Sequence, residues 1–130
     1  IVVVSKDEMT HIREQVEAMY APWTVRYIEG GTERQDSVAS GLSQVSLVAD
    51  IVLVHDGARP LANTALARRV IEGAKQYGAV VPAIPVVDTI KRVDTNGTVQ
   101  ETLVRSELYA MQTPQGFQKS ILVEAHSYAK

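Results

Sequence analysis

Residues 51–60, which read Ile-Val-Leu-Val-His-Asp-Gly-Ala-Arg-Pro, are the stretch that decides the fold. The first four are apolar and mostly β-branched, a pattern typical of a strand buried on both faces of a parallel sheet. The strand is followed by an acid, a glycine and a base: Asp56, Gly57 and Arg59. Ligands of open α/β sheets bind beyond the carboxyl ends of the strands, so these three residues are candidates for chemistry.

The residue types in this loop suit phosphate chemistry. A carboxylate such as Asp56 can hold a divalent cation, and a guanidinium such as Arg59 can bind a phosphate with two hydrogen bonds. The alternative is an ordinary surface ion pair between them, worth at most about 1 kcal/mol. A lone histidine at a strand end is more often hydrogen-bonded than catalytic, so His55 is expected to play a supporting role. The loop therefore predicts a phosphate-handling enzyme.

The composition of the chain narrows the classes of protein it can belong to. Its 130 residues, 45% of them hydrophobic and 22% charged, predict one globular domain over 1–130. The net charge of −2 gives no overall attraction to nucleic acid or to an anionic membrane. The chain has no cysteine, which excludes disulfides and thiolate sites and fits the cytosol. No apolar run approaches the roughly 20 residues of a transmembrane helix.

Hydrophobic periodicity alternates between strand and helix along the chain. This alternation is typical of a parallel, doubly wound α/β sheet. An Asn-Gly pair at 96–97 then predicts a tight hairpin turn between two short strands. The expected elements are strands at 1–4, 24–28, 51–55 and 80–87, helices beginning near Asp7, Asp36 and Asn63, hairpin strands at 89–93 and 98–104, and a last helix at 119–130.

Three further segments carry polar groups whose role the residues leave open. The loop 30–37 can present glycine backbone and a helix N-terminus to an anion or a nucleobase, or it is a plain β–α turn. Residues 88–92 bring a hydroxyl and two cations, or they form a charged edge strand that discourages aggregation. Arg105 follows the hairpin and either returns to a phosphate or faces solvent. The run 112–115, Gln-Thr-Pro-Gln, combines an amide, a hydroxyl and a locked φ angle.

Several familiar sites are absent from the sequence. It has no cysteine nucleophile and no Gly-x-Ser-x-Gly elbow, so covalent catalysis is poorly supported. Neither the dinucleotide-binding Gly-x-Gly-x-x-Gly pattern nor a Walker A sequence occurs.

Taken together, four blocks of the chain resemble the 2-C-methyl-D-erythritol 4-phosphate cytidylyltransferase family, in order and at matching spacing. The resemblance implies a homodimeric, Rossmann-like α/β fold with a mostly parallel sheet and a β-hairpin arm. It also implies transfer of CMP from CTP to the sugar-alcohol phosphate, with Mg²⁺ and release of pyrophosphate, in bacterial cytoplasm or plastid stroma. The blocks are Gly30-Gly31 with Arg34, Ser37 and Gly41-Leu42; Val54 to Pro60; Asp88 to Lys91; and Arg105-Ser106 with Gln112 to Phe117.

The resemblance implies roles for individual residues at two substrate sites. Gly31, Thr32 and Ser37 would recognise the cytosine, and Gly57 would lie near the nucleotide. Many relatives carry an acid at the position of Thr32 and an alanine at that of Gly57. Asp56 would hold the metal and act in catalysis.

The same resemblance implies roles for residues of the acceptor site and of the hairpin. Arg59 and Thr113 would line the pocket for methylerythritol phosphate. The arm, residues 88–107, would mediate dimerisation and carry Thr89 and Arg105 into the partner's active site. Arg59 and Arg105 would also neutralise charge during the reaction.

The ends of the chain are expected to lie inside a longer protein. The sequence opens in an apolar strand without methionine and closes within a predicted helix. The family's glycine-rich loop, with an arginine and a lysine, would precede Ile1, and a lysine motif would follow Lys130. Loss of one preorganised donor can cost about 10²–10³-fold in rate, so the 130-residue chain alone is expected to be inactive.

Two other functions fit parts of the sequence. The first is the same chemistry with ribitol 5-phosphate as acceptor, although Gly57-Ala58 and Lys91 favour methylerythritol phosphate. The second is a non-catalytic module that uses the hairpin only to dimerise. A metal-dependent phosphohydrolase would need a denser carboxylate cluster than Asp56 supplies.

Overall fold

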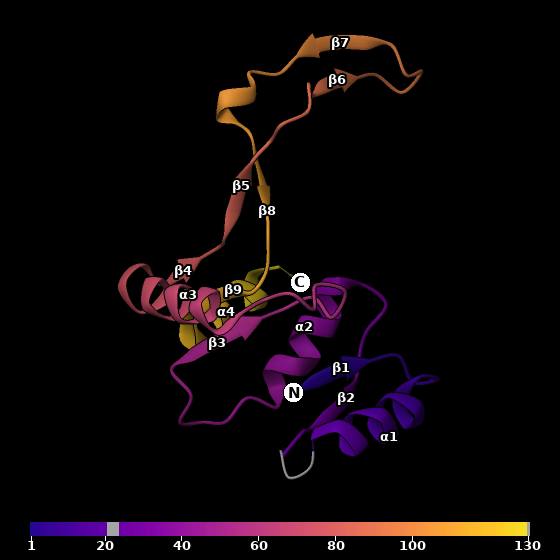
Figure 1. Cartoon of the computed structure of the whole chain (residues 1–130), viewed down its shortest axis with the longest axis vertical. Coiled ribbons are helices and arrows are strands. Elements are labelled where there is room, and N and C mark those ends of the chain that lie inside the picture. The colour runs from indigo at the N-terminus through magenta and orange to yellow at the C-terminus, as the bar shows by residue number, and fades with distance from the viewer. Residues whose placement is uncertain (21–23, 130) are drawn as a thin grey trace. The chain divides into compact units, whose positions relative to one another are not determined.

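The computed structural model describes residues 1–20 and 24–129, and it is a mixed α/β structure. The chain divides into two compact units (Figure 1). The first comprises Ile1–Val52 and Gln118–Lys130, and the second comprises Leu53–Phe117. In the described ranges, no helix is both long and apolar enough to cross a membrane.

A pair of parallel strands forms the centre of the first unit. Strand β1 (Val2–Val4) pairs with β2 (Tyr27–Glu29), with Val3 opposite Ile28. Between them in sequence lies helix α1 (Met9–Tyr20). The β–α–β order predicted for the start of the chain is thus observed, with its second strand at Tyr27–Glu29 in place of 24–28. Because the two strands are parallel, the carboxyl ends of β1 and β2 lie side by side.

Two further helices complete the first unit. Helix α2 (Arg34–Ser43) lies close to β1, and a Cβ at Gly41 would come within 3.0 Å of the Val3 side chain. Helix α4 (Lys119–Tyr128) buries Leu122 and is fixed at both ends. At its start, the Lys119 backbone N–H donates to Asp50 O (2.8 Å) and the Lys119 ammonium donates to Ser46 O (2.9 Å). At its end, Gln35 donates to Ala129 O (3.1 Å).

A three-stranded sheet has the order β3-β9-β4. Strand β3 is Ile51–Val54, β9 is Gln115–Gln118 and β4 is Ala79–Val80. The β3 strand confirms the prediction from residues 51–55. Strand β9 runs antiparallel to β4 and was not predicted, because Gln-Gly-Phe-Gln has neither an apolar run nor clear alternation.

Helix α3 (Thr64–Tyr77) begins and ends where the sequence predicts. The Asn63 side chain accepts a hydrogen bond from Leu66 N (2.9 Å), and Gly78 ends the helix with φ of 85°. An asparagine N-cap and a glycine with positive φ are the expected signals at these two places.

The buried face of α3 packs against β9. Val70 and Ala74 are 3% and 0% exposed, and together with Leu122 they form the hydrophobic core of the described residues. A Cβ at Gly116 of β9 would lie 2.5 Å from Val70 Cγ1 and 3.0 Å from the Val70 carbonyl oxygen. Only glycine allows the strand and the helix to approach this closely.

The second unit continues into a long antiparallel arm (Figure 1). Strand β5 (Ala83–Pro85) pairs with β8 (Tyr109–Met111), and β6 (Lys91–Val93) pairs with β7 (Val99–Thr102). A 3₁₀ turn, η1 (Arg105–Glu107), follows β7. The predicted hairpin is confirmed, and Gly97 has the positive φ (82°) that its turn requires.

The segment 80–87, whose two prolines predict a strand that is short or near an edge, contributes to two short strands. The expected single strand is divided into β4 and β5, with Pro82 between them, because a proline cannot donate to a central ladder. Strand β8 was also not predicted; it pairs with β5 and extends the ribbon below the hairpin.

Candidate functional site

The segment that follows β3 folds into a tight turn that carries the acid and the base. The Arg59 N–H donates to Asp56 O (3.0 Å), and Arg59 Nε lies 3.4 Å from Asp56 Oδ2. These side chains are 45% and 35% exposed, so their ion pair is worth at most about 1 kcal/mol. The ion pair alone therefore does not hold the turn in place.

A buried threonine from the far end of the unit binds the start of this turn. Thr113 is 6% exposed, and its Oγ1 accepts a hydrogen bond from Asp56 N (3.3 Å). The same oxygen lies 2.9 Å from His55 Nδ1, and His55 Nε2 lies 3.0 Å from Arg59 O. These contacts join residues 55–59 to a residue more than 50 positions away in sequence.

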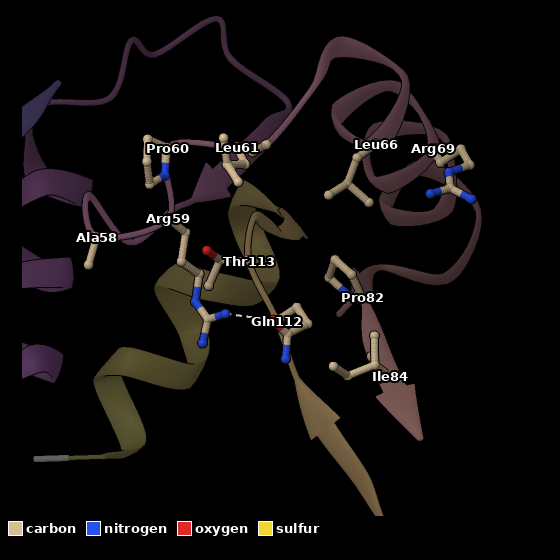
Figure 2. A pocket seen from close by; sticks show the side chains of 12 residues that line it. Ala58, Arg59, Pro60, Leu61, Leu66, Arg69, Pro82, Ile84, Gln112 and Thr113 are labelled. Carbon is tan, nitrogen blue, oxygen red and sulfur yellow. Dashed lines mark hydrogen bonds between the residues drawn. The ribbon is translucent and has the colours of Figure 1, made fainter. Parts of the chain in front are cut away.

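The Arg59 side chain is held from a third direction. Its Nη1 donates to Gln112 Oε1 at 2.5 Å (Figure 2). Gln112 is itself fixed, because its Nε2 donates to Ala110 O (3.0 Å) and its backbone N–H donates to Pro82 O (2.8 Å). The guanidinium is thus directed by an amide, which neutralises none of its charge.

These groups border a cavity of about 480 Å³ in the second unit (Figure 2). Its volume is in the range of small-molecule sites. Its polar contributors are two guanidiniums, an amide and a hydroxyl, and the rest of its wall is apolar. The lining residues are Ala58, Arg59, Pro60, Leu61, Ala62, Leu66, Arg69, Pro82, Ala83, Ile84, Gln112 and Thr113. Such a wall suits a small anion that carries hydroxyl groups. We call this cavity the arginine pocket.

A second cavity, of about 440 Å³, lies in the first unit at the carboxyl ends of β1 and β2. We call it the glycine pocket; Gly30, Gly31, Thr32 and Ser37 line it, with Val3, Val4, Ser5, Lys6 and Glu29. Gly31 N donates to Ser37 Oγ (3.2 Å), so the hydroxyl proton of Ser37 stays available to a ligand. A Cβ at Gly31 would overlap the Asp36 side chain, so glycine is required there.

The sequence indicated part of each pocket. In the arginine pocket it indicated Arg59 and Thr113, and the structure brings both together with Asp56. It gave no signal for the contact between Arg59 and Gln112, because a pairing across 53 residues leaves no local pattern. In the glycine pocket, the sequence could also have indicated Ser5 and Lys6, because they follow β1, the strand that runs parallel to β2.

Asp56 is bonded to Arg59 and Thr113 but is not among the lining residues, and three other predicted site residues also lie apart from both linings. Gly57 is exposed in the turn after β3, with no atom within 4 Å of where a Cβ would be. Thr89 is exposed between β5 and β6. Arg105 begins the 3₁₀ turn, and its Nη1 donates to Val87 O (2.9 Å). In the described part of the chain, none of the three lines either pocket.

Comparison with known proteins decides the family. A family model described as 2-C-methyl-D-erythritol 4-phosphate cytidylyltransferase matches residues 1–130, the whole chain. This chain belongs to the 2-C-methyl-D-erythritol 4-phosphate cytidylyltransferase family. The resemblance drawn from the four sequence blocks is thereby confirmed.

Curated cytidylyltransferases of this name are similar to the chain over its full length. The protein from Bacillus cereus is 45% identical over 130 residues, which are 100% of this chain and 57% of the relative. The protein from Syntrophus aciditrophicus is 38% identical, over 99% of this chain and 56% of its own length. The chain thus spans slightly more than half the length of these cytidylyltransferases.

Solved structures of the family share the fold. The 4-diphosphocytidyl-2C-methyl-D-erythritol synthase from Anaerococcus prevotii matches with a TM-score of 0.85 and 31% identity, over 98% of this chain and 55% of that one. The cytidylyltransferase from Thermus thermophilus matches with a TM-score of 0.69 and 39% identity, over 85% of this chain and 54% of that one. The α/β fold class predicted from the sequence is confirmed.

Proposed function

We propose that the protein carrying this chain transfers CMP from CTP to 2-C-methyl-D-erythritol 4-phosphate and releases pyrophosphate, in the non-mevalonate route to isoprenoid precursors. The observation that carries the proposal is a pocket lined by Arg59 and Thr113, both of which are bonded to Asp56, in a chain of this family. A phosphate oxygen of the acceptor attacks the α-phosphorus of CTP. A new P–O bond forms as the bond to the β-phosphate oxygen breaks, and pyrophosphate carries away the electron pair.

The arginine pocket is our proposed acceptor site. A guanidinium binds phosphate with two hydrogen bonds, and Gln112 presents Arg59 without neutralising it. The Thr113 hydroxyl and the apolar wall of Leu66 and Ile84 suit the polyol and its methyl group. Holding the attacking phosphate in one orientation is the main task of the protein in phosphoryl-transfer reactions.

The glycine pocket is our proposed cytosine site. The free hydroxyl proton of Ser37 and the backbone around Gly31 and Thr32 can hydrogen-bond the polar edge of a base. Because backbone groups do not depend on the side chain, a threonine at position 32 is compatible with this recognition. Gly57 is a further residue that we propose for nucleotide binding, since no atom lies within 4 Å of where its Cβ would be.

The donor set fits a magnesium ion that arrives with the nucleotide. Mg²⁺ is usually bound by one or two protein carboxylates together with substrate phosphates. Asp56 offers one partly exposed carboxylate, and residues 1–20 and 24–129 contain no cluster of three or more potential metal ligands. When bound, the ion would neutralise phosphate charge. Arg59 of this chain, and Arg105 on the arm, would add to that neutralisation.

We also propose that the protein is a homodimer joined through the arm, residues 88–107, and that it works in bacterial cytoplasm or plastid stroma. Apolar side chains are unusually exposed along the ribbon, which supports a covered surface there. Val93, Val99 and Val104 of the arm are each more than half exposed. Thr89 and Arg105 would then reach the partner's acceptor site. Sedimentation of the full-length protein and of an arm deletion would measure the dimer.

A pyrophosphate-release assay tests the activity. The full-length protein should turn over with CTP and methylerythritol phosphate, and much more slowly with ribitol 5-phosphate; the 130-residue chain alone should be inactive. Asp56→Ala should lower the rate by about 10²–10³-fold, as expected for loss of one preorganised catalytic group. A full-length protein that neither turns over nor shows a CTP-dependent thermal shift would refute the proposal in favour of a non-catalytic dimerisation module.

A further inference from the structure

His55 connects two parts of the arginine pocket, the turn that follows β3 and the residue Thr113. It is the first residue after β3, and its ring contacts Arg59 O through Nε2 (3.0 Å) and Thr113 Oγ1 through Nδ1 (2.9 Å). The ring therefore bridges the backbone of the arginine and the side chain of the threonine. In the described part of the chain, His55 is the one side chain that joins these two residues.

The chemistry of the partners fixes the direction of each hydrogen bond. A backbone carbonyl only accepts, so His55 Nε2 must carry the proton that is donated to Arg59 O. In the neutral ring Nδ1 then accepts, and the Thr113 hydroxyl donates to it. The same hydroxyl oxygen accepts the Asp56 N–H (3.3 Å). One tautomer thus satisfies three groups of the pocket at once.

The bridge constrains where Arg59 and Thr113 lie relative to one another. The ion pair between Asp56 and Arg59 joins two partly exposed side chains and is worth little. Gln112 holds the guanidinium end of Arg59 but not its backbone. The bond from His55 to Arg59 O, with the turn bond from Arg59 N to Asp56 O, fixes the backbone.

We propose that His55 is a positioning residue for the acceptor: it sets the Arg59 backbone and the Thr113 hydroxyl at the geometry that the sugar-alcohol phosphate requires. The inference rests on the proposed function and adds a residue to it. His55 does not touch the reacting atoms, so its loss should weaken acceptor binding selectively. The glycine pocket belongs to the other unit and shares no residue with this bridge.

Two conservative substitutions separate the two bonds in the full-length enzyme. The Asn amide reaches the position of Nδ1, so His55→Asn keeps an acceptor for Thr113 and loses the bond to Arg59 O. The longer Gln amide reaches the position of Nε2, so His55→Gln keeps the donor to Arg59 O and loses the hydrogen bond with the Thr113 hydroxyl. Each should raise the KM for methylerythritol phosphate roughly 2- to 13-fold, the effect of one net hydrogen bond. His55→Ala should raise it by about the product of the two.

The KM for CTP separates positioning from general loosening. It should rise less than the acceptor KM in all three variants, because the proposed cytosine site shares no residue with the bridge, and His11→Asn, which replaces an exposed histidine on α1, should change neither KM. Equal increases in both KM values, or a wild-type acceptor KM in His55→Ala, would overturn the inference while the activity stands. A wild-type enzyme without transfer activity would instead refute the proposed function.

A measurement on the unmodified protein avoids any effect of substitution on folding. Nitrogen NMR of the imidazole at alkaline pH should find the proton of His55 on Nε2 and none on Nδ1. The opposite tautomer, with the proton on Nδ1, would overturn the bridge whatever the kinetics. Thermal unfolding of each variant shows that the kinetic comparison is made between folded proteins.

Discussion

Replacing Gln112 with glutamate tests whether the arginine pocket binds an anion through Arg59. The change exchanges the neutral amide at the guanidinium for a carboxylate of nearly the same shape, 2.5 Å from Nη1 in the present rotamer. The acceptor phosphate would then meet a guanidinium with two carboxylate partners, where it now meets one that is paired with Asp56 alone. The substitution also removes the donor to Ala110 O, which an amide supplies and a carboxylate cannot.

The size of the effect follows from Coulomb's law at a partly exposed site. Two unit charges about 4 Å apart interact by about 1 kcal/mol in water and about 4 kcal/mol at the effective dielectric constant near a protein surface. Arg59 is 45% exposed, so screening keeps the effect toward the lower half of this range. We expect a loss of about 1 to 2.5 kcal/mol of acceptor binding, which raises its KM about 5- to 70-fold.

The assay is pyrophosphate release by the full-length enzyme, with methylerythritol phosphate varied at saturating CTP. Gln76→Glu is the matched control, because it adds the same charge on α3 outside the pocket lining. The control should leave both KM values unchanged, and the increase in Gln112→Glu should shrink at high salt. An acceptor KM in Gln112→Glu equal to that of the control would refute the assignment of Arg59 to an anionic acceptor.

Two further predictions concern stability and the arm. Gly116→Ala should destabilise the fold by about 1–3 kcal/mol, because its Cβ would meet Val70 Cγ1 at 2.5 Å. Gly57→Ala should be neutral or stabilising, because nothing lies within 4 Å of its Cβ. Equal denaturant midpoints for the two variants would contradict the packing. The pKa of Asp94 is lowered below 3.8, chiefly by the hydrogen bond from the backbone N–H of Thr98. The carboxylate therefore stabilises the hairpin fully above pH 3.8, and its contribution is lost as the pH falls through the lowered pKa. The Thr98 amide shift should follow that titration and be flat in Asp94→Asn; a midpoint at or above 3.8 would be inconsistent with these bonds.

What the sequence could predict was set by how local each signal is. The strand, the turn and the acid–base pair after it occupy ten consecutive residues, so periodicity and the strand-end rule suffice to find them. The Asn63 cap and the turn at Gly97 are likewise encoded within a few residues. The family resemblance added Thr113, which no local rule connects to Asp56.

The parts that could not be predicted depend on contacts between distant segments. Strand β9 has a polar, glycine-containing sequence, and it is a strand because α3 packs on Gly116 and β4 pairs with it. The partner of Arg59 is likewise an amide more than 50 residues away. Such pairings follow from tertiary packing, which overrides the weak β propensity of the segment.

Residues 112–116 have an unusual composition for a connecting segment. Three of these residues each meet a different structural requirement. Gln112 directs the guanidinium of Arg59, Thr113 binds Asp56 N and His55, and Gly116 admits α3. Because Gly116 is held against the buried Val70 and Ala74 of α3, the backbone that carries the two polar residues is fixed by core packing. The amide and the hydroxyl are therefore preorganised before a ligand binds, which reduces the ordering cost of binding. Arg59, which is 45% exposed whereas Thr113 is 6% exposed, then has more freedom than the threonine to adjust to the acceptor.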